Sequence, residues 1–284
     1  MGLNRSLIGK EYPPQDYGVT EEAIRRYARA YNEDNPWSLE AERPGGIIAP
    51  PMFGVVMGWL PIMLVMTDPD LEVDLLRLLH GEQDMYFYRT VAPGDIVTST
   101  AKILTIEEKA TGESIVVEVL STTQKNERLQ RMLFKAFIRG RGKRERGLED
   151  AVAEKPAGKP LFCVSQTMDR DQTYRYAQAS GDHNPIHTDE NIAKMAGLPG
   201  IIVHGLCTMA FTSKIMIDRL CGGDPRRLKR LSVRFSRPVF PGQTITTAIW
   251  PLPDRDGVKV YAYETENPER RAVLKDGIAE IAPA

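Results

Sequence analysis

The chain repeats part of itself at a nearly constant interval. Residues 25–38, RRYARAYNEDNPWS, match residues 174–187, YRYAQASGDHNPIH, at an offset of 149 positions. Further on, residues 87–97 match residues 235–245 at an offset of 148 positions. Two matches in the same order and at nearly the same interval indicate two related domains in tandem. With 284 residues in all, each half is long enough to bury a core of its own.

Both halves show the same order of hydrophobic patterns. An amphipathic helix comes first, with Thr20 or Asp169 placed to cap its exposed backbone amides. After a polar loop comes an apolar helix, near residues 52–66 in the first half and 206–220 in the second, too uniformly hydrophobic for a surface. Runs rich in β-branched residues follow, in which apolar and polar residues alternate and which Pro-Gly and Asp-Gly turns separate. This pattern predicts antiparallel strands with one solvent-exposed face. We therefore expect an α+β fold in which an antiparallel sheet wraps around a buried helix, twice.

The boundary between the halves is marked by a charged segment that is poor in apolar residues, at positions 139–160. Such a composition is typical of a solvated linker. We place the first domain at residues 1–145, the linker at 146–160 and the second domain at 161–284.

Composition excludes several classes of function. A net charge of -1 provides no field for holding nucleic acid. Residues 47–66 carry no charge and are long enough to span a bilayer, but their three prolines indicate a buried, interrupted helix instead of a membrane span. The amino terminus lacks the apolar core of a signal peptide, and the carboxyl terminus is not a peroxisomal address. We expect a cytoplasmic protein without disulfides, since its three cysteines are sparse and lack CxxC spacing.

The second-half loop is rich in titratable groups, and its first-half counterpart lacks them. Three of the four histidines lie between His183 and His204, beside Asp182 and Asn184. Because the first-half loop does without these groups, we interpret them as catalytic, with ordinary turn chemistry as the alternative. The differing pairs are Glu33 with Asp182, Ser38 with His187, and Pro50-Pro51 with His204-Gly205.

Other chemistries are less well matched by the spacing. The acidic and histidine side chains of the loop could supply metal ligands, but their spacing does not fit H-E-x-x-H or another zinc pattern, so we expect acid-base work and no metal. A nucleophilic Ser180 or Cys207 would lack an elbow such as GxSxG.

A family resemblance covers nearly the whole chain. The motif Y-A-x-x-S-G-D-x-N-P-x-H-x-D from Tyr176, followed by A-x-x-x-G and by I-x-H-G ending at Gly205, resembles the hydratase motif of MaoC-like (R)-specific enoyl-CoA hydratases and 3-hydroxyacyl dehydratases. The first half, with APPMF at residues 49–53 and LHGEQ at residues 79–83, resembles the dehydratase-like domain often fused to it. This resemblance implies a double hot-dog fold with a non-catalytic first domain and a catalytic second domain. It implies no cofactor.

The resemblance also assigns roles. Asp182 and His187 together hold and activate the water that adds to a trans-2-enoyl thioester of coenzyme A or acyl-carrier protein, and the backbone amide of Gly205 stabilises the oxyanion. The resemblance further implies that Asn184 and His204 are supporting residues, which hold the loop around Asp182 and His187 in its conformation.

Three further residues have open roles. Ser213 falls where related enzymes place a serine near the catalytic pair, but it could equally bond back to the preceding turn of its helix. Arg230 and Arg237 are candidates for binding the phosphates of coenzyme A, although such residues also solvate a strand edge.

Two other functions remain compatible with the pattern: an acyl-CoA thioesterase on the same fold, and a non-catalytic acyl-binding subunit of a larger hydratase. Two fused hot-dog domains can substitute for a dimer, yet open sheet edges also permit a homodimer.

Overall fold

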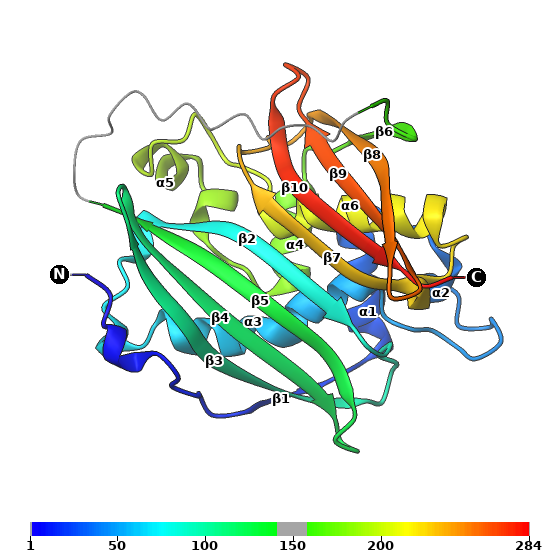
Figure 1. Cartoon of the computed structure of the whole chain (residues 1–284), viewed down its shortest axis with the longest axis horizontal. Coiled ribbons are helices and arrows are strands. Elements are labelled where there is room, and N and C mark those ends of the chain that lie inside the picture. The colour runs from blue at the N-terminus through cyan, green and yellow to red at the C-terminus, as the bar shows by residue number, and fades with distance from the viewer. Residues whose placement is uncertain (1, 141–157, 284) are drawn as a thin grey trace.

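The computed structural model describes residues 2–140 and 158–283 (Figure 1). The strands of these residues form one antiparallel sheet of ten strands, in the order β1-β3-β4-β5-β2-β7-β10-β9-β8-β6. Most of the linker predicted at residues 146–160 lies outside the described residues, which resume at residue 158.

Each half contributes five equivalent strands. Counted outward from the centre of the sheet, β2-β5-β4-β3-β1 of the first half mirrors β7-β10-β9-β8-β6 of the second. The first five strands are β1 (Gln15–Gly18), β2 (Leu78–Phe87), β3 (Ile96–Lys109), β4 (Gly112–Thr123) and β5 (Arg128–Arg139). The second five are β6 (Phe162–Thr167), β7 (Leu228–Phe235), β8 (Thr244–Arg255), β9 (Val258–Glu266) and β10 (Ala272–Ile281).

The two long helices lie against one face of this sheet, and Figure 1 shows α3 behind the first five strands and α6 behind the second five. The α-helices are α1 (Glu21–Ala30), α2 (Pro36–Leu39), α3 (Gly54–Met66), α4 (Gln172–Ser180), α5 (Glu190–Met195) and α6 (Gly205–Leu220). Short 3-10 helices are η1 (Arg5–Leu7), η2 (Pro51–Phe53), η3 (Pro69–Leu71), η4 (Leu75–Arg77), η5 (Pro185–His187) and η6 (Pro225–Arg227). The two halves of this sheet each wrap a long helix, which confirms the predicted double hot-dog fold.

Both apolar helices are buried, as predicted. In α6 every side chain from residue 206 to residue 213 is buried. In α3, Pro61 lies inside the helix and is buried, whereas Leu60 is 54% exposed. Among the described residues no helix is long and apolar enough to cross a membrane.

One predicted helix cap is correct and one is wrong. The Thr20 side chain accepts a hydrogen bond from the Ala23 N–H and caps α1. Asp169 does not cap α4, which begins after Asp171. Asp169 therefore stands two residues before the capping position, and its carboxylate forms an ion pair with Arg175 at 2.5 Å.

The two halves are joined at the centre of the sheet, where β2 pairs with β7 from Glu82 opposite Arg234 to Tyr86 opposite Arg230. Beneath this pairing, the hydroxyls of Tyr27 and Tyr176 lie 3.1 Å apart. These two tyrosines occupy the same place in the sequence repeat, so their contact marks the axis of internal symmetry.

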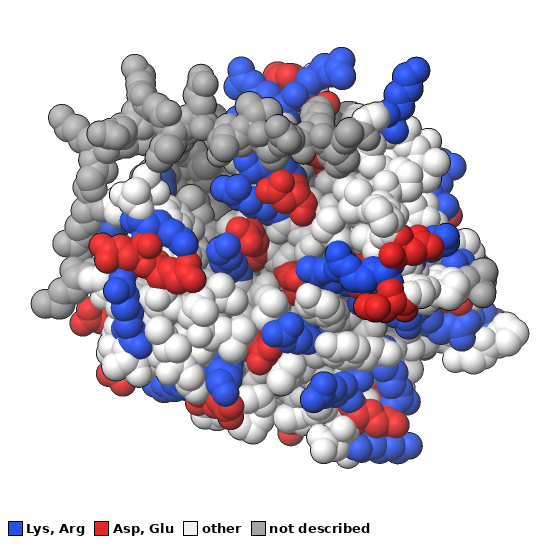
Figure 2. All heavy atoms as spheres, viewed as in Figure 1, with Lys and Arg blue, Asp and Glu red and all other residues white. Residues whose placement is uncertain are grey.

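Charged side chains of both signs are interspersed over the outer face of the sheet (Figure 2). On the described part of that face no large region carries a single sign of charge.

Candidate active site

The candidate loop starts at the carboxyl end of α4, where Gly181 adopts the left-handed conformation with φ 83° that favours glycine. A Cβ at this position would lie 3.4 Å from the indole of Trp59, which belongs to α3 of the first half. Directly after the turn, the Asp182 N–H donates to Ser180 Oγ at 3.2 Å. The loop is therefore held by its own helix and by the other half of the chain.

Asn184 shapes the next turn of the loop. Its N–H donates to Asp182 Oδ1 at 3.1 Å, and its Oδ1 accepts from the Ile186 N–H at 3.3 Å. This cap, with Pro185 at the first position, starts the short helix η5, which ends at His187. Asn184 itself is exposed, so its contacts support the predicted role in fixing the loop.

The hydrogen bonds of His187 define its tautomer. Its Nδ1 lies 2.8 Å from the carbonyl oxygen of Ile202. Because a carbonyl can only accept, Nδ1 carries the proton, and in the neutral ring Nε2 keeps a lone pair. Burial lowers the pKa of His187, and the neighbouring Asp182 opposes that effect. The neutral, basic form of the imidazole is thus favoured.

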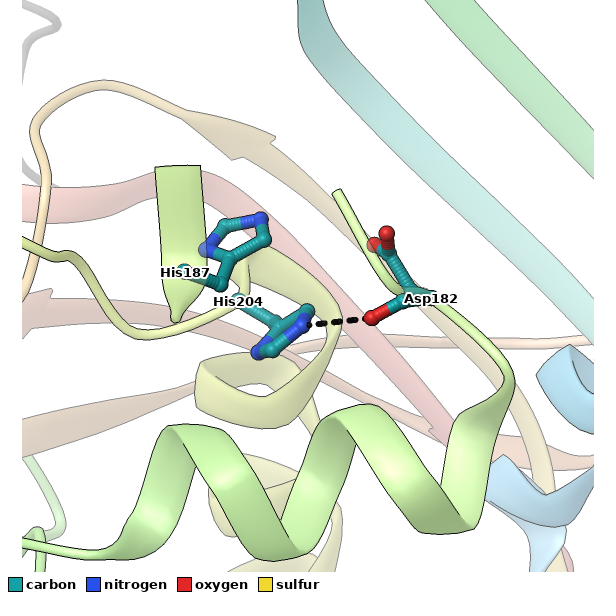
Figure 3. Close-up of side chains that lie close together, drawn as sticks. All are labelled: Asp182, His187 and His204. Atoms are coloured by element: carbon teal, nitrogen blue, oxygen red, sulfur yellow. Dashed lines mark hydrogen bonds between the residues drawn. The ribbon is translucent and has the colours of Figure 1, made fainter. Parts of the chain in front are cut away.

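His204 lies beneath both members of the predicted catalytic pair (Figure 3). Its ring stacks on His187 with centroids 3.7 Å apart, and its Nε2 donates to the backbone oxygen of Asp182 at 3.1 Å. Burial lowers the pKa of His204 well below its ordinary value, and the nearby His187 lowers it further. A neutral His204 therefore acts as a rigid support that positions Asp182 and His187 together.

The side chains of Asp182, His187 and His204 form a compact group, in which one ligand atom of each lies within 4.8 Å of the others. Burial raises the pKa of Asp182, an effect that His187 opposes. Such a group has the composition of a metal site, and a carboxylate beside a neutral imidazole is also the composition of an acid-base pair.

Gly205 is the first residue of α6, a helix of 16 residues whose amino end has no capping side chain. Its amide therefore lies at the positive end of the helix dipole. A Cβ here would lie 3.0 Å from the ring of Phe235, which itself lies 4.7 Å from the ring of His80 in β2. Both halves of the chain thus meet at the amino end of α6.

Ser213 is fully buried, and its hydroxyl has no hydrogen-bond partner among the described residues. The bond back to the preceding turn that we weighed for it is therefore not formed. No described contact joins Ser213 to Asp182 or His187, so its role stays a prediction.

The structure separates the two candidate arginines. Arg230 forms ion pairs with Asp84 at 2.9 Å and with Glu280 at 3.0 Å, and thereby links β2, β7 and β10. Arg237 is exposed and donates to the carbonyl of Ala272 at 3.2 Å. Only Arg237 keeps the exposure that binding a phosphate requires.

Arg230→Ala is expected to lower the free energy of unfolding by about 1.5–3 kcal/mol, the usual contribution of hydrogen bonds to charged groups. Urea denaturation measures this change, and KM for an acyl-CoA substrate should stay unchanged. Lys259→Ala, which removes an exposed ion pair with Asp254, is the matched control with little effect. A raised KM with unchanged stability would instead support phosphate binding by Arg230.

The first-half loop has the same pattern of hydrogen bonds to the backbone as the second-half loop that contains Asp182 and His187. The Ser38 hydroxyl donates to the carbonyl of Ile48 at 3.0 Å, as His187 Nδ1 does to Ile202 at 2.8 Å. Asn35 accepts from the Trp37 N–H as Asn184 accepts from the Ile186 N–H. Serine thus keeps the structural hydrogen bond of the histidine but has no second nitrogen to act as a base.

Glu33, the counterpart of Asp182, is held in a different environment. Its buried carboxylate accepts from Tyr31 Oη at 2.9 Å and forms an ion pair with Lys214 of α6 at 3.5 Å. Burial raises the pKa of Glu33, as it raises that of Asp182, and the nearby Lys214 opposes that effect. The difference between the two loops is the partner, because Ser38 offers no imidazole beside Glu33. The first-half loop therefore keeps the structural hydrogen bonds of its counterpart but lacks the carboxylate–imidazole pair.

Sequence reasoning missed the contributions of the first half to the site, namely Trp59 against Gly181 and His80 against Phe235. The LHGEQ segment, which contains His80, was noticed only as a resemblance. Its position beside Phe235 depends on the pairing of β2 with β7, two strands far apart in the chain.

The fold and the compact group of Asp182, His187 and His204 define the class of protein as a double hot-dog enzyme with a candidate acid-base site. Comparison with known families agrees with this class. The family described as MaoC like domain matches residues 151–272, and the family described as FAS1-like, dehydratase domain region matches residues 6–132.

Curated relatives and solved structures extend the comparison. Enoyl-CoA hydratase 2, peroxisomal, of Arabidopsis thaliana is 30% identical over 75% of this chain and 71% of its own length. Probable enoyl-CoA hydratase 2 of Dictyostelium discoideum is 27% identical over 98% of this chain and 96% of its own length. A MaoC-like dehydratase from Phytophthora capsici, 24% identical, shares the fold with a TM-score of 0.84 over 100% of this chain and 98% of its own. The chain belongs to the MaoC-like hydratase and dehydratase family.

Proposed function

We propose that the protein catalyses the reversible syn hydration of trans-2-enoyl thioesters to (3R)-3-hydroxyacyl thioesters. One observation carries this proposal: the basic Nε2 of His187 and the carboxylate of Asp182 belong to one compact group with His204, and His204 directly precedes the uncapped amino end of α6. The relatives named as enoyl-CoA hydratases support the same reaction.

The chemistry follows from electron withdrawal by the thioester carbonyl, which makes C3 of the enoyl group electrophilic. A water molecule held by Asp182 and His187 transfers a proton to this pair while its oxygen forms the bond to C3. The electrons of the double bond move onto the carbonyl oxygen, and the Gly205 amide stabilises the resulting charge. The pair then returns a proton to C2 on the same face, so the protein ends the cycle in its starting state.

A hydration assay tests the reaction directly. Crotonyl-CoA should lose its enoyl absorbance, and chiral analysis should identify (3R)-3-hydroxybutanoyl-CoA as the product. Free thiol release, measured in parallel, should be absent. Thiol release without hydration would identify a thioesterase, and no turnover of either kind would favour a non-catalytic binding subunit.

Hydration should be lost on the acid side of neutrality. The mechanism needs an ionised Asp182 and a neutral His187, and burial shifts the pKa of His187 below its ordinary value and that of Asp182 above its own. His187 therefore loses its active form only when the pH falls below about 6.5, the ordinary pKa of histidine, whereas Asp182 loses its own at a pH above the ordinary carboxyl value. We expect kcat/KM to be constant above neutrality and to decline as the pH falls through the acid range.

A second pH profile separates the two groups. In Asp182→Asn the carboxylate that raises the pKa of His187 is gone, so the decline of the residual activity should move to lower pH. A profile that declines above pH 7, or that does not move in the variant, would contradict the assignment.

We further propose how the work is divided within the chain. Residues 1–145 form a non-catalytic domain that completes the site through α3 and β2, and residues 161–284 carry the catalytic groups. The acyl group is delivered as a thioester of coenzyme A or acyl-carrier protein, and comparison of both substrates in the hydration assay distinguishes them. A homodimer and a cytoplasmic location are proposed from the sequence, to be checked by light scattering and by cell fractionation.

A further inference from the structure

A cavity of about 240 Å³ lies away from the Asp182–His187 pair, neither of which lines it. Its walls come from the first half, with η6 and the start of β7 from the second half. The lining residues that matter here are Ala49, Pro50, Met57, Phe87, Thr90 and Lys229.

This cavity is the symmetric counterpart of the catalytic site. The Ala49 N–H donates to the Val91 carbonyl at 2.7 Å, as the Val203 N–H donates to the Val239 carbonyl at 2.8 Å. The equivalence places Pro50 and Pro51 where His204 and Gly205 stand in the second half. The first half thus has a cavity at the place where the second half has its candidate catalytic groups.

The cavity is also separate from the catalytic site. Strand β2 runs from one to the other: His80 contacts Phe235 beside Gly205, and Phe87 lines the cavity. Seven residues of strand at roughly 3.3 Å each separate these ends by about 23 Å. A short acyl chain bound at Asp182 does not reach that far.

The charges at the cavity point to an anionic ligand. Arg89 forms an ion pair with Glu127, and Arg226 forms one with Asp224 at 2.7 Å. The ammonium of Lys229 forms no ion pair or hydrogen bond with the described residues, although Lys229 is only partly exposed. A cation of this kind beside apolar walls suits a ligand with an apolar chain and one negative end.

We propose that this cavity is a second, non-catalytic site that binds an acyl chain ending in an anionic group, with Lys229 as its counter-charge. An apolar cavity of about 150 Å³ already holds benzene, so the larger volume here accommodates a chain of several carbons. The anion is a free fatty carboxylate or a phosphate of a second acyl thioester. The proposal is independent of the proposed hydration reaction.

Calorimetric titration of the full chain with octanoate tests the site. We expect one octanoate per chain. Lys229→Glu should weaken binding at least about tenfold, because it replaces attraction by repulsion. Thr90→Trp should fill the cavity and abolish binding. Lys159→Glu, an exposed lysine that does not line the cavity, is the matched control and should bind as the parent does.

Saturated butanoyl-CoA, which has no double bond to hydrate, identifies the source of the anion. Octanoate that binds equally in its presence supports a carboxylate site apart from the catalytic one. Binding of two butanoyl-CoA molecules per chain would support an acyl thioester, provided that the weaker of the two binding events is lost in Lys229→Glu and that octanoate displaces that molecule. The proposal is overturned if octanoate does not bind at millimolar concentration, or if Lys229→Glu binds it as the parent does. Circular dichroism checks folding, and Lys229→Glu alone decides if Thr90→Trp misfolds.

Discussion

Asp182→Asn and His187→Ser are each expected to lower kcat/KM for crotonyl-CoA hydration by about 10³-fold, within the range that a positioned acid-base group contributes. Asparagine keeps the oxygen that accepts from the Asn184 N–H but cannot take a proton. Serine reproduces the first-half loop, where Ser38 makes the hydrogen bond that His187 makes here. Both substitutions therefore remove chemistry while retaining the local fold.

His183→Gln is the matched control, because His183 is an exposed histidine on the same loop. It should retain nearly full activity. Circular dichroism and urea denaturation should show that all three variants fold like the parent. If Asp182→Asn or His187→Ser keeps more than a tenth of the activity, the assignment of that residue to proton transfer is wrong.

Gly205→Pro is expected to lower kcat by about 10²- to 10³-fold, the effect of removing one oxyanion donor. Proline has no N–H, yet the first position of a helix tolerates it. The preceding residue, His204, has φ -55° and ψ 135°, an extended conformation that is allowed before proline. The first half already has Pro51 at the equivalent position, so the fold accepts the substitution.

Gly205→Ala separates the loss of the amide from the cost of added bulk. Both variants place a Cβ about 3.0 Å from the Phe235 ring, but only alanine keeps the N–H. We expect Gly205→Ala to lose much less activity than Gly205→Pro. Equal losses in steady-state kinetics would show that close approach to Phe235, and not the amide, explains the need for glycine.

Patterns within the sequence were enough to predict most elements of the fold. The buried helices and seven of the strands have clear periodicity, and the repeat showed that they occur twice. Strands β1 and β6 are short edge strands, whose existence depends on their partners β3 and β8. Strand β2 contains Gly81 and several polar residues that do not alternate, since its pairing with strands on both sides decides its structure.

The candidate site was found from the sequence because the chain contains two versions of one loop. Comparing Ser38 with His187 separated residues that the loop needs for folding from residues that it does not. The sequence could not show the tautomer of His187 or its stacking on His204, because both depend on carbonyls and rings brought together by tertiary structure. It also could not show that Arg230 is committed to Asp84, a partner 146 residues away.

The pairing of β2 with β7 has a consequence for how the protein behaves on dilution. In a dimer of single domains, the two halves of this sheet would separate at low concentration, and the site at their junction would come apart. Here both strands belong to one polypeptide, so their effective concentration is fixed by the chain itself. The specific activity should therefore not depend on enzyme concentration, and one half could lose its catalytic residues without affecting assembly of the other.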